Sequence, residues 1–367
     1  MKTDIDPQRA PNWASWETWA MWIVALAIAF TGGMIANWVG TPLPWLLGAL
    51  VATAIAMVFG ITVRGLPLSI PQPVRMAFIT VIGVAIGGTA SPDMFTEIGA
   101  WWPSLLAVLV FVGGAQAMNY QIFRRIGAYD RPTAFYSAMP GGLIESVQLG
   151  EEAGGNPALL AVQHFTRITL TVIAVPLIYW AVRGEAVGSS AGVSLDQSSA
   201  PIAAPDVALL IGCAVIGGWG GRFIGLPASI VTGPVLLSVL VHAIGWTEAQ
   251  PPDWMIAIAQ LVVGLGLATR FQGIPGRALW QGLRMGALTV TLMLSLGAAL
   301  AAGLSAAGGQ PWQVLFMVYS PGGVVEMGLI ALSLEVSPVL VTLHHLLRIT
   351  ITVMVMPFIG RAFLARY

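Results

Sequence analysis

A succession of apolar segments, most of them close to 20 residues long or longer, constrains the fold of this chain more than any other feature. A helix of about 20 residues, rising about 1.5 Å per residue, spans the roughly 30 Å hydrocarbon core of a bilayer. Only 9% of the 367 residues are charged, whereas a soluble domain carries about 25%. A soluble enzyme and a disordered protein are thereby excluded, and the sequence predicts an all-α polytopic membrane protein.

Twelve such segments can be recognised, six on either side of a stretch rich in Ser, Gly and Ala. They lie near residues 18–38, 44–62, 74–91, 98–122, 132–150, 157–182, 206–222, 228–245, 254–270, 279–303, 312–334 and 338–361. We therefore expect a first membrane repeat over 1–183, a polar linker over 184–205 and a second membrane repeat over 206–367. The N-terminus has neither a basic region nor a cleavage site, so we expect a retained first span rather than a signal peptide.

The two halves resemble each other in sequence. Residues 140–178 align with residues 321–359 without gaps at a constant offset of 181, and 14 of the 39 positions are identical. Upstream, Gly40-Thr41-Pro42 aligns with Gly225-Leu226-Pro227 at an offset of 185. Because charged residues recur at fixed spacing inside apolar segments, the pattern indicates an internal duplication.

The charges of matching loops bear on how the repeats are oriented in the membrane. Lys and Arg are enriched in cytoplasmic loops. The loops of the first half carry Arg64 and Arg75, then Asp93 and Glu97; the matching loops of the second half carry Glu248 and Asp253, then Arg270 and Arg277. This exchange of sign favours inverted repeats, as in many secondary transporters. Twelve full spans with parallel repeats are the alternative.

Inversion requires an odd number of crossings in each repeat. We therefore expect two inverted repeats of about five spans, each with one further segment that is re-entrant or broken at its Pro-Gly-Gly sequence. The arginine-rich loops then all face one side. This arrangement predicts a multi-pass protein of a bacterial inner (cytoplasmic) membrane, with both termini in the cytoplasm.

Each half carries the pattern Pro-Gly-Gly-x-x-Glu inside its fifth segment. A break there exposes backbone N–H groups at the start of a half-helix, where the helix dipole suits an anion. The candidate substrate-binding residues are Pro140, Gly141, Gly142, Pro321, Gly322 and Gly323. Glu145 and Glu326 are candidates for ion coupling, because ionisable groups inside a membrane are usually functional. The alternatives are tight helix packing for the glycines and helix capping for the glutamates.

The sixth segment of each half carries the pattern His-x-x-Arg-x-Thr-x-Thr. Arg167 and Arg348 lie about ten residues inside their segments, too deep for easy snorkelling, so each is expected to bind an anion or to pair with the glutamate of its own half. His164 and His345 share a helix face with these arginines. Together with Thr169 and Thr350 they are secondary candidates for the site.

Several classes of site are not supported by the sequence. Cys213 is the only cysteine, which excludes an intramolecular disulfide and a cysteine-based metal centre. The four histidines form no cluster at metal-ligand spacing, and no nucleotide-binding or hydrolase motif is present. The net charge is zero, so nothing points to nucleic acid. We expect neither a metal nor another cofactor, and no enzymatic activity.

The duplicated block with Met139-Pro140-Gly141-Gly142 and Ser320-Pro321-Gly322-Gly323, together with the two glutamates, resembles the bacterial membrane AbrB family and its twofold "AbrB duplication" module. The resemblance covers residues 20–363. Members of that family carry labels such as ammonia monooxygenase or regulator of another gene's expression. The residues do not offer the metal site that a monooxygenase requires.

Three functions are consistent with these features. The first is a secondary transporter of a small, anionic organic solute, coupled to protons or another ion. The second is a membrane sensor or regulator of gene expression that binds a ligand without moving it. The third, disfavoured, is the membrane monooxygenase of the family label. The expected partners are the lipid bilayer, a small-molecule solute and, as is common among such transporters, a second copy of the chain in a homodimer.

Overall fold

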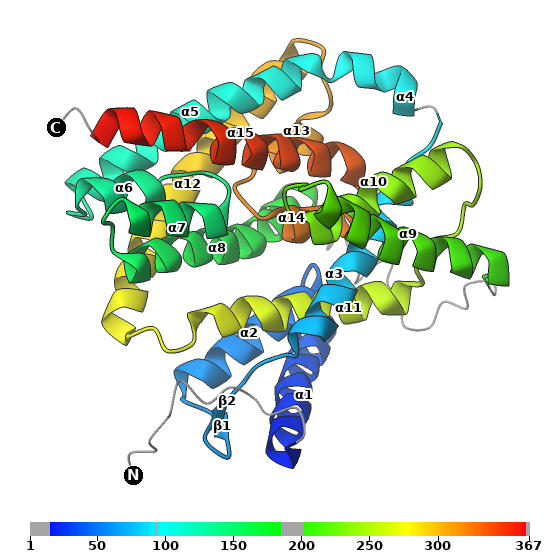
Figure 1. Ribbon diagram of the computed structural model, residues 1–367, viewed down its shortest axis with the longest axis horizontal. Coiled ribbons are helices and arrows are strands. Elements are labelled where there is room, and N and C mark those ends of the chain that lie inside the picture. Colours follow the sequence, from blue (N-terminus) through cyan, green and yellow to red (C-terminus); the bar gives the residue numbers. More distant parts are fainter. Residues whose placement is uncertain (1–14, 93, 185–201, 365–367) are drawn as a thin grey trace.

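The computed structural model describes residues 15–92, 94–184 and 202–364, and within these ranges the chain is almost entirely helical (Figure 1). The N-terminal residues that argued against a signal peptide, Asp93, and residues 185–201 of the predicted linker lie outside the described residues. The described part confirms an all-α membrane protein. Its only strands are β1 (Thr62–Val63) and β2 (Leu66–Pro67), which form one antiparallel hairpin.

The helices follow the same order in the two halves of the chain. The first half contains α1 (Trp16–Val39), α2 (Pro44–Val58), α3 (Gln72–Gly87), α4 (Met94–Glu97), the 3-10 helix η1 (Ile98–Ala100), α5 (Trp102–Arg125), α6 (Arg131–Ser137), α7 (Leu143–Glu152) and α8 (Pro157–Arg183). The second contains α9 (Ala204–Phe223), α10 (Ser229–Ala243), α11 (Asp253–Ala268), the 3-10 helix η2 (Thr269–Phe271), α12 (Gly276–Ala306), α13 (Trp312–Tyr319), α14 (Val324–Ser333) and α15 (Pro338–Leu364). Apart from α4, each helix of the first half has a counterpart in the second.

Seven helices among the described residues are long and apolar enough to cross a membrane. They are α1, α5, α8, α9, α11 with η2, α12 and α15. Large apolar side chains stay exposed on their outer faces, for instance Trp38, Val215 and Phe358, which suits contact with lipid rather than water. Shorter apolar helices of 10–17 residues accompany them: α2, α3, α10 and α14. The multi-pass membrane fold is thereby established, while the number of ten spans stays a prediction.

The first two helices of each half cross at glycines. A Cβ atom added at Gly32 of α1 would collide with the backbone of Gly48 in α2. At matching positions, a Cβ atom at Gly233 of α10 would collide with the carbonyl of Gly217 in α9. Small residues allow helix backbones to approach closely in membranes, so these glycines explain why the two pairs pack alike.

The halves are interleaved rather than placed side by side. α2 packs on α11 and α10 packs on α3, which are reciprocal pairings between matching elements. In the same way α12 packs on α8, and α5 packs on α15 (Figure 1). The main hydrophobic core runs through both halves and includes Phe111, Val172 and Met293. The two broken segments therefore lie inside one shared core.

Candidate functional site

The predicted break at each Pro-Gly-Gly sequence is confirmed. In the first half, α6 ends at Ser137 and α7 begins at Leu143, whereas in the second α13 ends at Tyr319 and α14 begins at Val324. Proline has no N–H to continue a helix, and the two glycines that follow it allow a sharp change of direction. Glu145 and Glu326 lie in the first turns of α7 and α14, as the sequence predicts.

The first broken segment is a hairpin. A Cβ atom added at Gly150 of α7 would lie 3.0 Å from the Cβ of Tyr136 in α6. At the open end, the backbone N–H of Asn156 donates to the Thr133 hydroxyl over 2.7 Å. The chain thus enters and leaves at the same end, with the Pro-Gly-Gly turn at the tip.

The buried arginines hold the tips of the broken segments. The guanidinium of Arg167 donates to the carbonyl of Met139, the residue before the first Pro-Gly-Gly sequence. Arg348 donates to the matching carbonyl of Ser320 over 2.6 Å, and also to the carbonyl of Gly322. The last carbonyls of α6 and α13 have no helical partner, and a cation near a helix C-terminus is favourable. The two arginines therefore stabilise equivalent breaks in the same way.

The expected pairing of each arginine with the glutamate of its own half is wrong. Among the described residues, the hydrogen bonds of both guanidinium groups go to backbone carbonyls and, for Arg167, to His164, and none goes to Glu145 or Glu326. The reason is the hairpin geometry, which brings the carbonyl before the proline, rather than the side chain after the glycines, to the arginine.

The histidines also bind the broken segments. His164 and His345 are fully buried. The Nε2 of His164 lies 3.0 Å from the Tyr136 carbonyl, and its Nδ1 lies 3.2 Å from an Arg167 nitrogen. A neutral imidazole with its proton on Nε2 satisfies both contacts. The Nε2 of His345 lies 3.1 Å from the Ser320 carbonyl. Each histidine is thus placed to position a tip.

Each tip contacts the long helix of the other half. A Cβ atom added at Gly141 would lie 3.2 Å from the hydroxyl of Thr352 in α15. Reciprocally, a Cβ atom at Gly322 would lie 3.5 Å from the methyl group of Thr171 in α8. Thr171 and Thr352 are matching residues of the duplication. The two Pro-Gly-Gly turns and the two long helices therefore form one central site.

The threonines that contact the tips lie two residues beyond the predicted candidates, Thr169 and Thr350. Thr350 donates to the carbonyl of Leu346 in its own helix, and the hydroxyl of Thr169 is buried without a partner. Thr171 and Thr352, two residues farther along, are the ones that contact the tips. Both recur in the duplication, but so do Thr169 and Thr350, and recurrence alone therefore does not distinguish the two pairs.

The centre of the site carries an excess of positive charge. Arg167 and Arg348 are 5% and 2% exposed, and the Nε atoms of both are buried without a hydrogen-bond partner. The tip that Arg167 holds contacts α15, which carries Arg348, and the tip that Arg348 holds contacts α8, which carries Arg167, so both charges lie in the same central region. Two buried like charges without a carboxylate among their hydrogen-bond partners are costly, because charge in a low-dielectric interior requires compensation. Such an uncompensated pair of positive charges suits an anionic ligand.

The two glutamates differ in their surroundings. Glu326 is 6% exposed, and its carboxylate folds back over Gly323 at the start of α14. It attracts Arg75 of α3, which is in turn repelled by Arg270 of η2. Glu145 is only half-buried, near Gly142. The buried carboxylate of the second half therefore lies near Arg75, a basic residue that nothing in the sequence connects with it.

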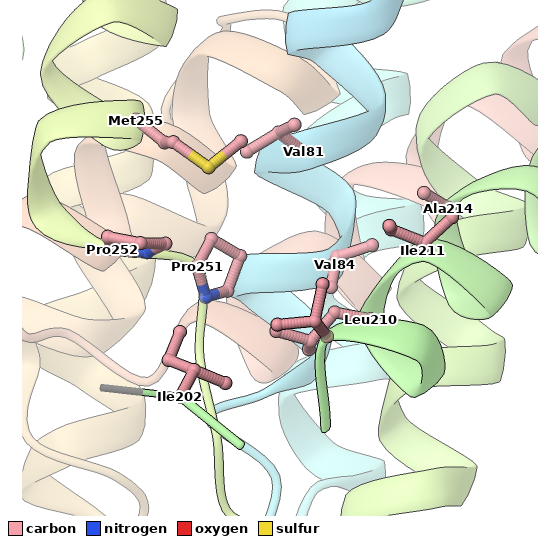
Figure 2. A pocket seen from close by; sticks show the side chains of 10 residues that line it. Val81, Val84, Ile202, Leu210, Ile211, Ala214, Pro251, Pro252 and Met255 are labelled. Atoms are coloured by element: carbon pink, nitrogen blue, oxygen red, sulfur yellow. The ribbon is translucent and has the colours of Figure 1, made fainter. Parts of the chain in front are cut away.

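A separate cavity lies away from this site, between α3, the start of α9 and the start of α11 (Figure 2). Its volume is about 270 Å³, and every side chain that lines it is apolar, including Val84, Leu210 and Met255. It offers no group for an anion. Within the described residues, no group of three or more His, Cys, Asp and Glu side chains could hold a metal ion.

Known proteins resemble this chain over nearly its whole length. The family described as "Transition state regulatory protein AbrB" matches residues 54–364. A protein of Escherichia coli (strain K12) named "Putative regulator AbrB" is 24% identical over 350 residues, which cover 95% of this chain and 97% of that protein. "Uncharacterized protein YhjN" of Bacillus subtilis (strain 168) is 22% identical over 364 residues, which cover 92% of this chain and 91% of that protein. The match over most of its length, with the duplicated broken segments inside it, establishes that the chain belongs to the AbrB family.

Proposed function

We propose that this protein is a secondary transporter of a small anionic organic solute, and that an ion or proton gradient drives it. The solute would bind at the centre of the molecule, between the two Pro-Gly-Gly turns. Arg167 and Arg348 would supply the positive charge, and Glu326, with Glu145 in the matching position, would couple transport to the ion.

One observation carries this proposal: two arginines from different halves are buried close together with no carboxylate among their hydrogen-bond partners. Both retain an unpartnered Nε donor. A guanidinium group presents its donors in a planar fork that matches a carboxylate or phosphate. An anionic solute would supply the compensating charge, and its departure would leave the repulsion that favours a change of conformation.

An inverted arrangement of the repeats supports alternating access in this proposal. Gln250, in the loop after α10, donates from its amide to the carbonyl of Gly88 at the end of α3 over 3.0 Å. Inverted repeats place these two loops on the same, outer face, whereas twelve spans with parallel repeats would place them on opposite faces. The bacterial inner membrane and cytoplasmic termini follow from the same arrangement through the arginine-rich loops.

The second candidate is a membrane regulator that binds the same anion without moving it. The name of the Escherichia coli relative favours this reading. It would use the same two arginines, but the turns would change conformation only to signal to a partner. Binding and flux therefore have to be measured separately.

The test begins with a thermal-stability screen of detergent-purified protein against mono-, di- and tricarboxylates, amino acids and inorganic anions. A ligand that binds only the folded state raises its stability, by about 2.7 kcal/mol at a hundred times the dissociation constant. We expect one class of anion to raise Tm, and this effect to be lost in Arg348→Gln. The stabilising anion is then offered to proteoliposomes under an imposed proton or sodium gradient.

In the proteoliposomes we expect gradient-driven uptake by the native protein, abolished by Glu326→Gln. Glu248→Gln, which neutralises an exposed loop carboxylate, is the matched control and should transport normally. Stabilisation without uptake would replace the transporter by the regulator. Absence of stabilisation by any anion would refute the anion site itself.

A further inference from the structure

A second basic site lies at the ends of two spans, apart from the central one. A hollow of about 370 Å³ is lined by Tyr120, Gln121, Arg124, Arg125, Arg131 and Phe363. Three of these six residues are arginines, and none of the described lining residues is acidic. The hollow is formed where α5 and α15 end and α6 begins.

We propose that this hollow binds the phosphate group of an anionic phospholipid. Three guanidinium groups can together surround a phosphodiester, which accepts several charge-assisted hydrogen bonds. Basic pockets between helices at the cytoplasmic face of a membrane are suited to such head groups. This site is independent of the central anion site and does not rest on the proposed transport function.

The floor of the hollow is fixed by the turn that connects α5 to α6. Arg124 donates to the carbonyl of Tyr129, and the Tyr129 ring stacks on Phe123 with a centroid distance of 5.4 Å. The Tyr129 hydroxyl accepts a hydrogen bond from Gln163 over 2.7 Å. Burial raises the pKa of the Tyr129 phenol, so it stays neutral and adds no negative charge beneath the arginines. The nearest acidic residue in sequence, Asp130, caps α6 through both carboxylate oxygens.

The surroundings favour a lipid over a free anion. Both α5 and α15 are long enough to span a bilayer and end at this hollow, which places it at the level of the head groups. Below it, α15 exposes Met354, Val355, Phe358 and Ile359 along one side, a surface that acyl chains can cover. Phe363 packs edge-on against Tyr120, with centroids 5.3 Å apart, and joins this apolar surface to the basic hollow.

The experiment measures thermal unfolding of the delipidated protein in a neutral detergent, with phosphatidylglycerol, phosphatidylcholine or inorganic phosphate added. We expect phosphatidylglycerol to raise Tm by several degrees and the other two additives to have little effect. The double variant Arg125→Gln/Arg131→Gln should lose most of this increase. Arg222→Gln removes an exposed arginine at the end of another span, α9, and should keep it.

Each contrary result is decisive. Equal stabilisation of the native protein and the double variant would overturn the site. Equal stabilisation by phosphatidylcholine would show that charge is not recognised, and a full effect of inorganic phosphate would make this a free-phosphate site instead. Should the double variant fail to fold, Arg125→Gln alone, at an exposed position, is compared with Arg222→Gln by native mass spectrometry of bound phosphatidylglycerol.

Discussion

At the scale of single residues, the two central arginines have a structural and a chemical role at once. Each binds the carbonyl before Pro-Gly-Gly at the end of a broken helix, and the Nε donor of each is buried without a hydrogen-bond partner. A lysine would retain the charge but not the fork of donors. Substitution of an arginine by lysine therefore tests the planar arrangement of the donors separately from the positive charge.

Arg348→Lys should lower the stability of the protein, because an ammonium group cannot reach the Ser320 and Gly322 carbonyls together in the way a guanidinium does. A hydrogen bond to a charged group contributes about 1.5–3 kcal/mol, so we expect a loss of that size in thermal or denaturant unfolding. Arg361→Lys, at an exposed position of the same helix, is the control and should change stability little. Equal losses in the two variants would contradict the assigned role.

Sequence reasoning identified the central arginines, glutamates and glycines because they recur at a fixed offset inside apolar segments. It could not identify their partners, because contacts between α8 or α15 and the opposite tip depend on how the halves interleave. Thr171 and Thr352 were therefore missed. For the same reason the sequence suggested Glu–Arg pairs within each half, while the structure has arginine–carbonyl contacts.

At the scale of elements, the fold depends on glycines that allow helices to cross closely. At the crossing of α9 and α10, a Cβ atom added at Gly233 would collide with the carbonyl oxygen of Gly217. The segments themselves were predictable from hydropathy, and so were their glycine pairs. The exact helix lengths were not predictable, because several helices begin or end beside residues with positive φ rather than at polar residues, as α1 ends just before Gly40 and α2 begins just after Leu43.

Gly233→Ala should be strongly destabilising, because its added methyl group would overlap the carbonyl of Gly217 and force α9 and α10 apart. Overpacking of this kind costs about 1–3 kcal/mol or more. Gly218→Ala, on α9 with open space around its Cα, is the matched control and should be neutral or slightly stabilising. The measurement is the midpoint of thermal unfolding in detergent, and a tolerated Gly233→Ala would argue against the crossing.

At the scale of the whole molecule, matching elements exchange partners between the halves, as α2 with α11 and α10 with α3. Such reciprocal packing requires both halves to be present, so neither is expected to fold alone. The hydropathy pattern could suggest two repeats, but not this interleaving, which depends on contacts far apart in the sequence. Orientation in the membrane is the property that loop charges predict most directly.

The orientation can be measured with single cysteines introduced into a Cys213→Ala background. Inverted repeats place Gln272 in the cytoplasm and Glu248 outside, because the loops that hold them carry opposite charge. A membrane-impermeant maleimide added to intact cells should label Glu248→Cys at once, and Gln272→Cys only after permeabilisation. Both positions are exposed in the fold, so the labelling depends only on the side of the membrane on which each residue lies. The reverse pattern would contradict this orientation of the chain in the membrane.

The two Pro-Gly-Gly turns do not have the same backbone. Gly142 is left-handed, with a φ of 62°, whereas Gly323 is extended, with a φ of −81°. Their sequences are nearly alike, and glycine accepts both conformations at little cost. The same turn therefore adopts two backbone conformations within one molecule. If the repeats are inverted, exchanging the conformations of the two turns between the halves would give the same molecule seen from the opposite side of the membrane. If the protein is also a transporter, each half would show the conformation that the other half adopts when the site opens to the opposite side of the membrane.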